Sequence, residues 1–170
     1  MTAEAWNSIK NLVKLANGEY IALERLESIY KSCNLVANIC VHASTSANQP
    51  MAIIIPHEAH LRNYLAAKGL DATAELGVLT ADKQVAEFVL KEVNAVGKKN
   101  GFKGAELLEA VVLTPDEWTP ESGLVTAAQK IQRVKIAKAF ESQIKVRFLS
   151  SGVGHCGGTD PLDFQAVYKH

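Results

Sequence analysis

The feature that most constrains the fold of this 170-residue chain is the apolar run Ala52-Ile53-Ile54-Ile55, which Pro56 ends. β-Branched side chains favour extended backbone, and consecutive apolar residues place apolar side chains on both faces of a strand. Such a strand is stable only when both of its faces are covered. The chain is long enough for this, because a protein of its size buries roughly 70% of its unfolded surface.

Other strands are predicted from β-branched or short apolar runs. The run from Val36 to Val41 is expected to lie antiparallel to Ala52–Ile55, after a break at Ser44–Pro50. Two further runs flank Asn17-Gly18, a pair that tolerates positive φ, and so predict a β-hairpin. These hairpin strands are Leu12–Lys14 and Tyr20–Ala22, and a last strand is predicted over Leu107–Leu113.

Apolar residues at helical spacing predict about four helices. They cover residues 23–32, 57–67, 81–97 and 133–146, with Thr80 as the expected cap of the third. Gly69–Leu79 is a connection without a clear period. Strands and helices mix without strict alternation, so the fold class is α+β, with a small, mostly antiparallel sheet and an N-terminal hairpin packed by these helices.

Composition excludes several classes of function. Lys plus Arg equals Asp plus Glu, so the net charge is zero and no global field favours nucleic acid. A local basic stripe of Lys130, Arg133, Lys135 and Lys138 is the only remaining argument for it. The three cysteines have no regular spacing, which indicates reduced thiols in an intracellular protein. The sequence shows no signal peptide and no apolar run long enough to span a membrane.

Three segments are distinguished by composition. Residues 1–8 are small and polar and are interpreted as a leader. Residues 9–149 carry the predicted strands and helices and form one domain. Residues 150–170 begin with a glycine-rich stretch and are interpreted as a flexible tail.

Candidate chemistry is sparse when it is judged by spacing alone. Lys130 precedes a predicted helix, where a lysine can reach a phosphate or carboxylate, but a solvated lysine is the commoner case. The hairpin at Lys14–Tyr20 lets backbone approach a ligand closely, but judged by spacing alone an ordinary turn is the better explanation. His57 and His60 have a spacing that can hold a metal, but no third ligand follows. We therefore expect no metal site.

Several stretches resemble the C-terminal, lid-forming domain of eukaryotic long-chain acyl-CoA synthetases, the fungal members above all. The resemblance runs in order from about residue 9 to residue 147. Its most specific parts are Asn17-Gly18-Glu19-Tyr20, Glu117-Trp118-Thr119-Pro120 and Gln129-Lys130-Ile131-Gln132-Arg133.

This resemblance implies a role in fatty acid–CoA ligation. The family forms an acyl-adenylate from a fatty acid and Mg-ATP and then transfers the acyl group to CoA, and its small domain takes two poses on a large N-terminal adenylation domain. Lys130 matches the lysine that acts in adenylation. The hairpin residues Lys14, Gly18, Glu19 and Tyr20 match the segment that lines the CoA channel.

The same resemblance sets expectations for cofactors and location. ATP, Mg²⁺ and CoA are expected in the full-length ligase, and none is expected to bind this domain alone. The isolated chain is expected to be inactive. The parent enzyme is expected to be intracellular and cytoplasmic, reaching membranes, lipid droplets or peroxisomes through other regions.

Two departures from the family pattern leave a second hypothesis open. Asn7 and Ser8 stand where the family has its hinge pair, and the tail has no counterpart in the family. A free-standing binding or interaction module, with a carbohydrate, nucleotide or protein as ligand, is the alternative. A ligand screen set against an activity assay separates the two hypotheses.

Overall fold

A computed structural model describes residues 12–150, with side chains up to residue 147. The predicted leader, and the glycine-rich tail beyond residue 150, lie outside the described residues. The strands are β1 (Leu12–Lys14), β2 (Tyr20–Ala22), β3 (Val36–His42), β4 (Met51–Pro56) and β5 (Ala110–Leu113). The helices are α2 (Leu23–Tyr30), α3 (Glu58–Ala67), α4 (Leu76–Ala81), α5 (Lys83–Lys99), α6 (Arg133–Ala139) and α7 (Glu141–Ser150), with a 3₁₀ turn η1 (Gly104–Glu106).

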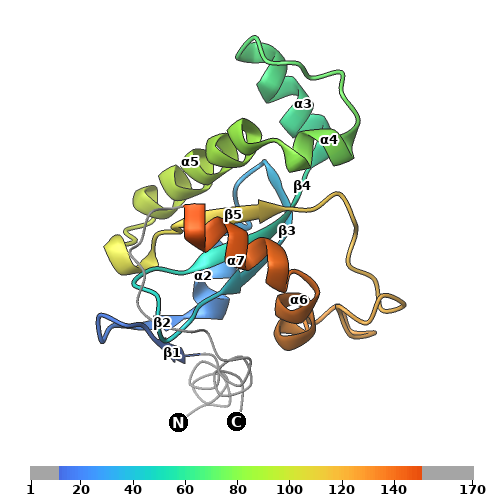
Figure 1. The fold of residues 1–170 in the computed structure, drawn as a ribbon. Coiled ribbons are helices and arrows are strands. Elements are labelled where there is room, and N and C mark those ends of the chain that lie inside the picture. Colours follow the sequence, from blue (N-terminus) through green and yellow to red (C-terminus); the bar gives the residue numbers. More distant parts are fainter. Residues whose placement is uncertain (1–11, 151–170) are drawn as a thin grey trace.

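The main sheet, in the order β3-β4-β5, forms the middle of three layers. Its first face packs on α2 and α5 through a cluster that includes Ala52 and Ile54. Its second face packs on α6 and α7 through a cluster that includes Met51, Ile53 and Ile55. Alternate residues of β4 thus belong to different clusters, and all six are buried. This confirms the prediction that the strand is covered on both faces (Figure 1).

The sheet is mixed rather than purely antiparallel. β3 and β4 are antiparallel, as predicted, with Ile39 opposite Ile54. β5 pairs parallel to β4, with Ile53 opposite Val112. The helices α3, α4 and α5 connect β4 to β5, and such a helical crossover returns the chain to the same end of a sheet. The α+β class is confirmed, and the two-stranded hairpin β1-β2 is antiparallel.

The strand β5 is shorter than the predicted strand Leu107–Leu113, because Leu108 bonds to a helix instead of the sheet. The side chain of Asn94 on α5 donates to the carbonyl of Leu108 (2.8 Å) and accepts from the Leu108 N–H (2.9 Å). Both backbone groups of Leu108 are therefore satisfied away from β4. The strand begins only at Ala110.

The helices also differ from the prediction in three places. Thr80 does not cap the long helix: it lies inside α4, and the Asp82 carboxylate accepts from the Gln84 N–H (2.7 Å) as the cap of α5. The connection before Thr80 contains the short helix α4. The final helix is divided at Phe140 into α6 and α7. The described residues therefore hold six α-helices rather than four.

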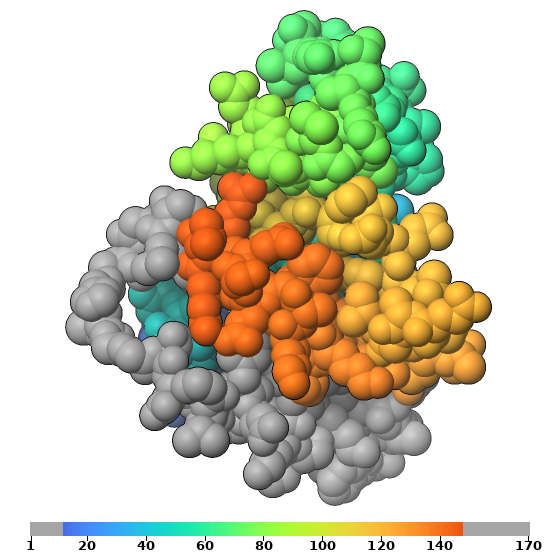
Figure 2. All heavy atoms as spheres, turned by 45° about the vertical axis from the view of Figure 1, so that its right-hand side comes forward, coloured from blue at the N-terminus to red at the C-terminus, as the bar shows by residue number. Residues whose placement is uncertain are grey.

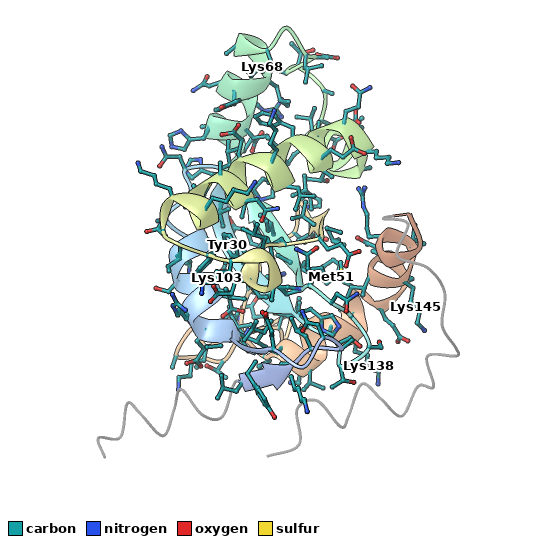
Figure 3. All side chains as sticks on the ribbon, turned by 90° about the vertical axis from the view of Figure 1, so that its left-hand side faces the viewer. Tyr30, Met51, Lys68, Lys103, Lys138 and Lys145 are labelled. Carbon is teal, nitrogen blue, oxygen red and sulfur yellow. The ribbon has the colours of Figure 1, made fainter. Side chains whose placement is uncertain are left out.

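Layers on opposite sides of the sheet present different residues. Figure 3 labels Tyr30 on α2, on the first face, and Lys138 and Lys145 on α6 and α7, on the second. In Figure 2, α6 and α7 and the segment after β5 cover the second face.

Between residues 12 and 150, no helix has the length and apolar character needed to cross a membrane.

Candidate functional site

Lys130 lies at the end of a tight loop that precedes α6. The loop is closed by a bridge between Val125 and Ile131. At its end the Thr126 N–H donates to the carbonyl of Lys130 (2.8 Å), and the Thr126 hydroxyl accepts from the Lys130 N–H (3.1 Å). Lys130 itself is exposed. Hydrogen bonds thus fix the backbone of Lys130, while the residue as a whole is exposed to solvent.

The residue before the lysine holds an unusual conformation. Gln129 has φ +58°, the left-handed region that costs most residues about 1–2 kcal/mol. Its N–H donates to the carbonyl of Thr126 (2.8 Å), which holds the turn in this form. The conformation turns the chain sharply just before Lys130, so the loop stores strain at the position where the resemblance places the chemistry.

A buried ion pair anchors the other side of the loop. Arg133, the first residue of α6, forms a bidentate pair with Glu27 of α2, and its Nη2 donates to Glu27 Oε2 at 2.7 Å. Each side chain is only 10% exposed. Glu27 Oε1 also accepts from the backbone N–H of Val41 on β3 (2.8 Å). One carboxylate therefore connects α2, β3 and the start of α6.

The thiol of Cys40 lies beside this ion pair. Burial and the neighbouring Glu27 carboxylate raise the pKa of Cys40 to about 12, although Arg133 opposes the shift. A thiol with so high a pKa stays protonated at neutral pH, and the nucleophile is the thiolate. Cys40 is therefore a packing residue of the second cluster rather than a reactive group.

Lys130 is one of the residues that line an open depression of about 640 Å³. The depression is formed by two segments that are far apart in the sequence: Glu24 and Glu27 of α2 on one side, and the run from Gln129 to Lys135 on the other. Lysine and arginine side chains thus share the depression with two carboxylates. A mixed lining of this kind is suited to contact with a polar, charged surface or ligand.

The hairpin predicted to be functional has a defined geometry. Lys14 and Tyr20 are directly opposite each other on β1 and β2, and the Lys14 ammonium lies 5.8 Å from the centre of the Tyr20 ring. That arrangement is a cation–π contact. Tyr20 is 64% exposed, while Val13 and Ile21, on the other face of the hairpin, are buried. The hairpin therefore presents an aromatic and a cationic group outward.

The turn of the hairpin depends on glycine. Gly18 has φ +84°, and no atom lies within 4 Å of the place that a side-chain carbon would take there, so conformation rather than space requires glycine. The Glu19 N–H donates to Asn17 Oδ1 (3.0 Å), and the carbonyl of Glu19 accepts from the Leu15 N–H (2.8 Å). Glu19 is exposed at the tip.

The predicted site residues form two separate groups. None of the four hairpin residues lines the depression that contains Lys130, as far as the described residues show. Glu27 is not among the predicted site residues, although the sequence carries a signal for it. Leu23, Leu26 and Tyr30 have the spacing of an apolar helix face, and Glu27 occupies the fourth position of that face. A charge at such a position indicates a buried partner.

The two histidines considered as metal ligands lie at the start of α3. Their ring centres are 4.4 Å apart, and both residues are exposed. Within residues 12–147, no three His, Cys, Asp or Glu side chains gather in a group that could hold a metal ion.

Comparison with known proteins gives matches in sequence and in structure. No family model matches the chain. Long-chain-fatty-acid–CoA ligase 1 of Schizosaccharomyces pombe is 45% identical over 140 residues, which are 82% of this chain and 21% of the relative. Ligase 1 of Saccharomyces cerevisiae is 40% identical over 84% of the chain, and the palmitoyl-CoA ligase FUM16 of Gibberella moniliformis is 35% identical over 85%.

Solved structures show the same fold in adenylation domains. The adenylation domain of a carboxylate reductase from Mycobacterium chelonae matches with a TM-score of 0.68 and 22% identity, over 83% of this chain and 20% of that one. The corresponding domain from Segniliparus rugosus, solved with AMP and a carboxylic acid, matches with a TM-score of 0.67. The chain spans about a fifth of the length of the curated relatives it matches. It corresponds by sequence to a partial domain of the fungal long-chain-fatty-acid–CoA ligases.

Proposed function

We propose that this chain acts as the mobile C-terminal domain of a long-chain fatty acid–CoA ligase, and that Lys130 assists formation of the acyl-adenylate. The observation that carries the proposal is the loop that ends at Lys130. Its backbone is fixed by the Val125–Ile131 bridge and by Thr126, while the lysine is exposed at its end. A cation held in this way can be placed against a partner surface without first ordering its backbone.

The chemistry assigned to Lys130 is electrostatic. In adenylation a carboxylate oxygen of the fatty acid attacks the α-phosphorus of ATP, and pyrophosphate leaves. Negative charge accumulates around the phosphorus as the bond forms, and an ammonium group nearby stabilises that charge. The proposal leaves Mg²⁺ to the full-length ligase and assigns to this chain only the cation of Lys130.

The hairpin is proposed to serve the second step, in which the thiol of CoA attacks the acyl carbonyl and AMP leaves. Gly18 and Glu19 form the tip of the hairpin, and Lys14 and Tyr20 lie outward on its strands. A glycine turn leaves backbone uncovered, which suits the wall of a narrow channel. The separation of the hairpin from the Lys130 depression supports a domain that uses a different surface in each step.

The domain is proposed to depend on a large N-terminal adenylation domain for activity. The described residues offer an open depression around Lys130, whereas small-molecule sites usually enclose most of their ligand. One lysine cannot bind ATP, fatty acid and CoA by itself. The isolated chain is therefore expected to produce no acyl-CoA.

A hybrid enzyme tests the proposal. Residues 9–149 would replace the matching fifth of Long-chain-fatty-acid–CoA ligase 1 of Schizosaccharomyces pombe. Acyl-adenylate formation would be measured separately from transfer of a supplied acyl-adenylate to CoA. Lys130→Ala is expected to slow the first step about 10²–10³-fold and to leave the second nearly unchanged. Lys138→Ala is the matched control, because Lys138 is also exposed and lies on the adjoining α6.

The outcomes separate the two hypotheses. Equal loss in both lysine variants would show a general charge effect and would contradict the assignment of Lys130. A folded but inactive hybrid would favour the free-standing binding module. Tyr20→Ala should raise the KM for CoA without slowing adenylation, and the reverse pattern would contradict the role of the hairpin.

A further inference from the structure

We propose that Glu27 and Arg133 form a positioning pair that sets where the Lys130 loop lies against α2 and β3. This inference rests on the proposed function of Lys130 and adds two residues that do not touch the reacting groups. The two residues are 106 positions apart in the sequence, yet their side chains meet in a bidentate pair. Both side chains are largely buried, so the pair is shielded from solvent at the base of the loop.

Glu27 is held on several sides, so its position is fixed by the core. It projects from α2 with Leu23, Leu26 and Tyr30, all of which are buried in the first cluster. Its Oε1 accepts the N–H of Val41, which is on β3, one of the two edge strands of the described three-stranded sheet. The carboxylate is therefore part of the rigid body of the domain. Any group that pairs with it takes its position from that body.

Arg133 transmits this position to the loop. It is the first residue of α6 and comes three residues after Lys130. Its planar fork fits a carboxylate in one orientation, which fixes direction as well as distance. A lysine would keep the charge and lose that orientation.

The pair is better explained by positioning than by stability. Removing two charges from water offsets much of their attraction, so apolar residues of similar volume stabilise such a place equally well. An apolar contact has no preferred direction, whereas the fork has one. The depression beside the pair contains Lys130 itself, which is where direction matters.

The loop has two anchors, and the pair is one of them. The other is the short ladder in which Val125 meets Ile131 and the Gln132 N–H donates to the carbonyl of Leu124 (2.9 Å). When the ion pair is broken, the ladder remains, but the position of the loop relative to α2 is no longer fixed. A displacement of about 1 Å at a catalytic group costs about 100-fold in rate.

The first test follows the intact 170-residue chain and does not depend on enzyme activity. Hydrogen exchange would be measured at the amides of Thr126, Lys130 and Gln132. Glu27→Gln keeps an acceptor for Val41 but removes the charge, and Arg133→Lys keeps the charge but removes the fork. Both should speed exchange at these amides at least roughly tenfold relative to the amides of β4.

The matched control is Arg25→Gln. Arg25 also lies on α2 and forms an ion pair, with Glu106 at 2.9 Å, but it is 58% exposed and its partner belongs to η1 rather than to the loop. Its replacement should leave exchange in the loop unchanged. If either variant of the buried pair unfolds, loss of protection in β4 reveals it, and the other variant carries the test.

The second test uses the hybrid enzyme. Glu27→Gln and Arg133→Lys should lower acyl-adenylate formation about 10- to 100-fold, with little change in the KM for fatty acid and normal transfer to CoA. Arg25→Gln should retain the rate. Folded variants with a protected loop and unchanged adenylation would overturn the positioning role. If the hybrid is inactive even without these substitutions, while the loop still exchanges faster in the two variants, the positioning role is sustained. That outcome would contradict the proposed function of Lys130 instead.

Discussion

His42, the last residue of β3, shows how one buried side chain makes stability depend on pH. The residue is 5% exposed, and burial lowers the pKa of its imidazole from 6.5 to about 4. The folded protein therefore keeps the ring neutral, whereas the unfolded chain takes up a proton near pH 6.5. Stability is complete above about pH 6.5 and falls as the pH drops from there towards 4, because protons bind the unfolded state first.

His42→Gln should remove this dependence. A shift of this size corresponds to at most about 3 kcal/mol of unfolding free energy lost by the native protein between pH 6.5 and pH 4. All other titratable groups are common to both proteins, so their contributions cancel in the comparison. Urea unfolding of both proteins at several pH values in this range measures the difference. Curves that run parallel would show that His42 carries no such energy.

At the scale of elements, α2 and α5 approach each other at a glycine. Gly97 of α5 is buried, and a side-chain carbon placed there would lie 2.9 Å from ring atoms of both Tyr30 and Phe102. Those two rings meet edge to face with centres 5.2 Å apart, and the Tyr30 hydroxyl donates to the carbonyl of Glu106 (2.7 Å). The rings are thus held in place and cannot easily yield.

Gly97→Ala should destabilise the protein although it favours the helix. Alanine gains about 1 kcal/mol of helix propensity over glycine, and overpacking a tight core costs about 1–3 kcal/mol. We expect a net loss of about 1 kcal/mol, read from the urea midpoint. Ala95→Gly, at an exposed position two residues earlier, measures the propensity alone. An increase in stability for Gly97→Ala would mean that the rings move aside.

At the scale of the whole molecule, a single sheet joins two hydrophobic clusters. Ile54 belongs to the cluster under α2 and α5, and Ile53 belongs to the cluster under α6 and α7. Both are fully buried, and they are adjacent in β4. Neither layer of helices can leave the sheet without uncovering one face of this strand. The two clusters should therefore unfold together.

Ile53→Ala and Ile54→Ala test this cooperativity. Each should cost about 2–5 kcal/mol, because each removes buried methyl groups and leaves a cavity. Trp118 reports on the second cluster, and far-UV circular dichroism reports on all the helices. In a protein that also carries Trp6→Phe, the unfolding midpoints of the fluorescence and circular dichroism signals should move to the same lower urea concentration. This is expected for each of the two isoleucine variants. A shift of circular dichroism without a shift of Trp118 fluorescence would show two independent units.

The sequence by itself determined the elements whose signals are local. The apolar run of β4, the Asn17-Gly18 turn and the apolar spacing of α2 depend on residues within a few positions of one another, so they could be predicted and were confirmed. The position of Lys130 before a helix was equally visible. Its proposed role came from resemblance, because an exposed lysine has no pattern of its own.

Tertiary structure decided what depends on partners distant in the chain. The start of β5 is set by Asn94, and β5 is parallel because three helices return the chain to the same end of the sheet. Glu27 is the clearest case, since its partner Arg133 is 106 residues away. Local spacing indicates that such a charge is buried, but only the packed layers determine which group neutralises it.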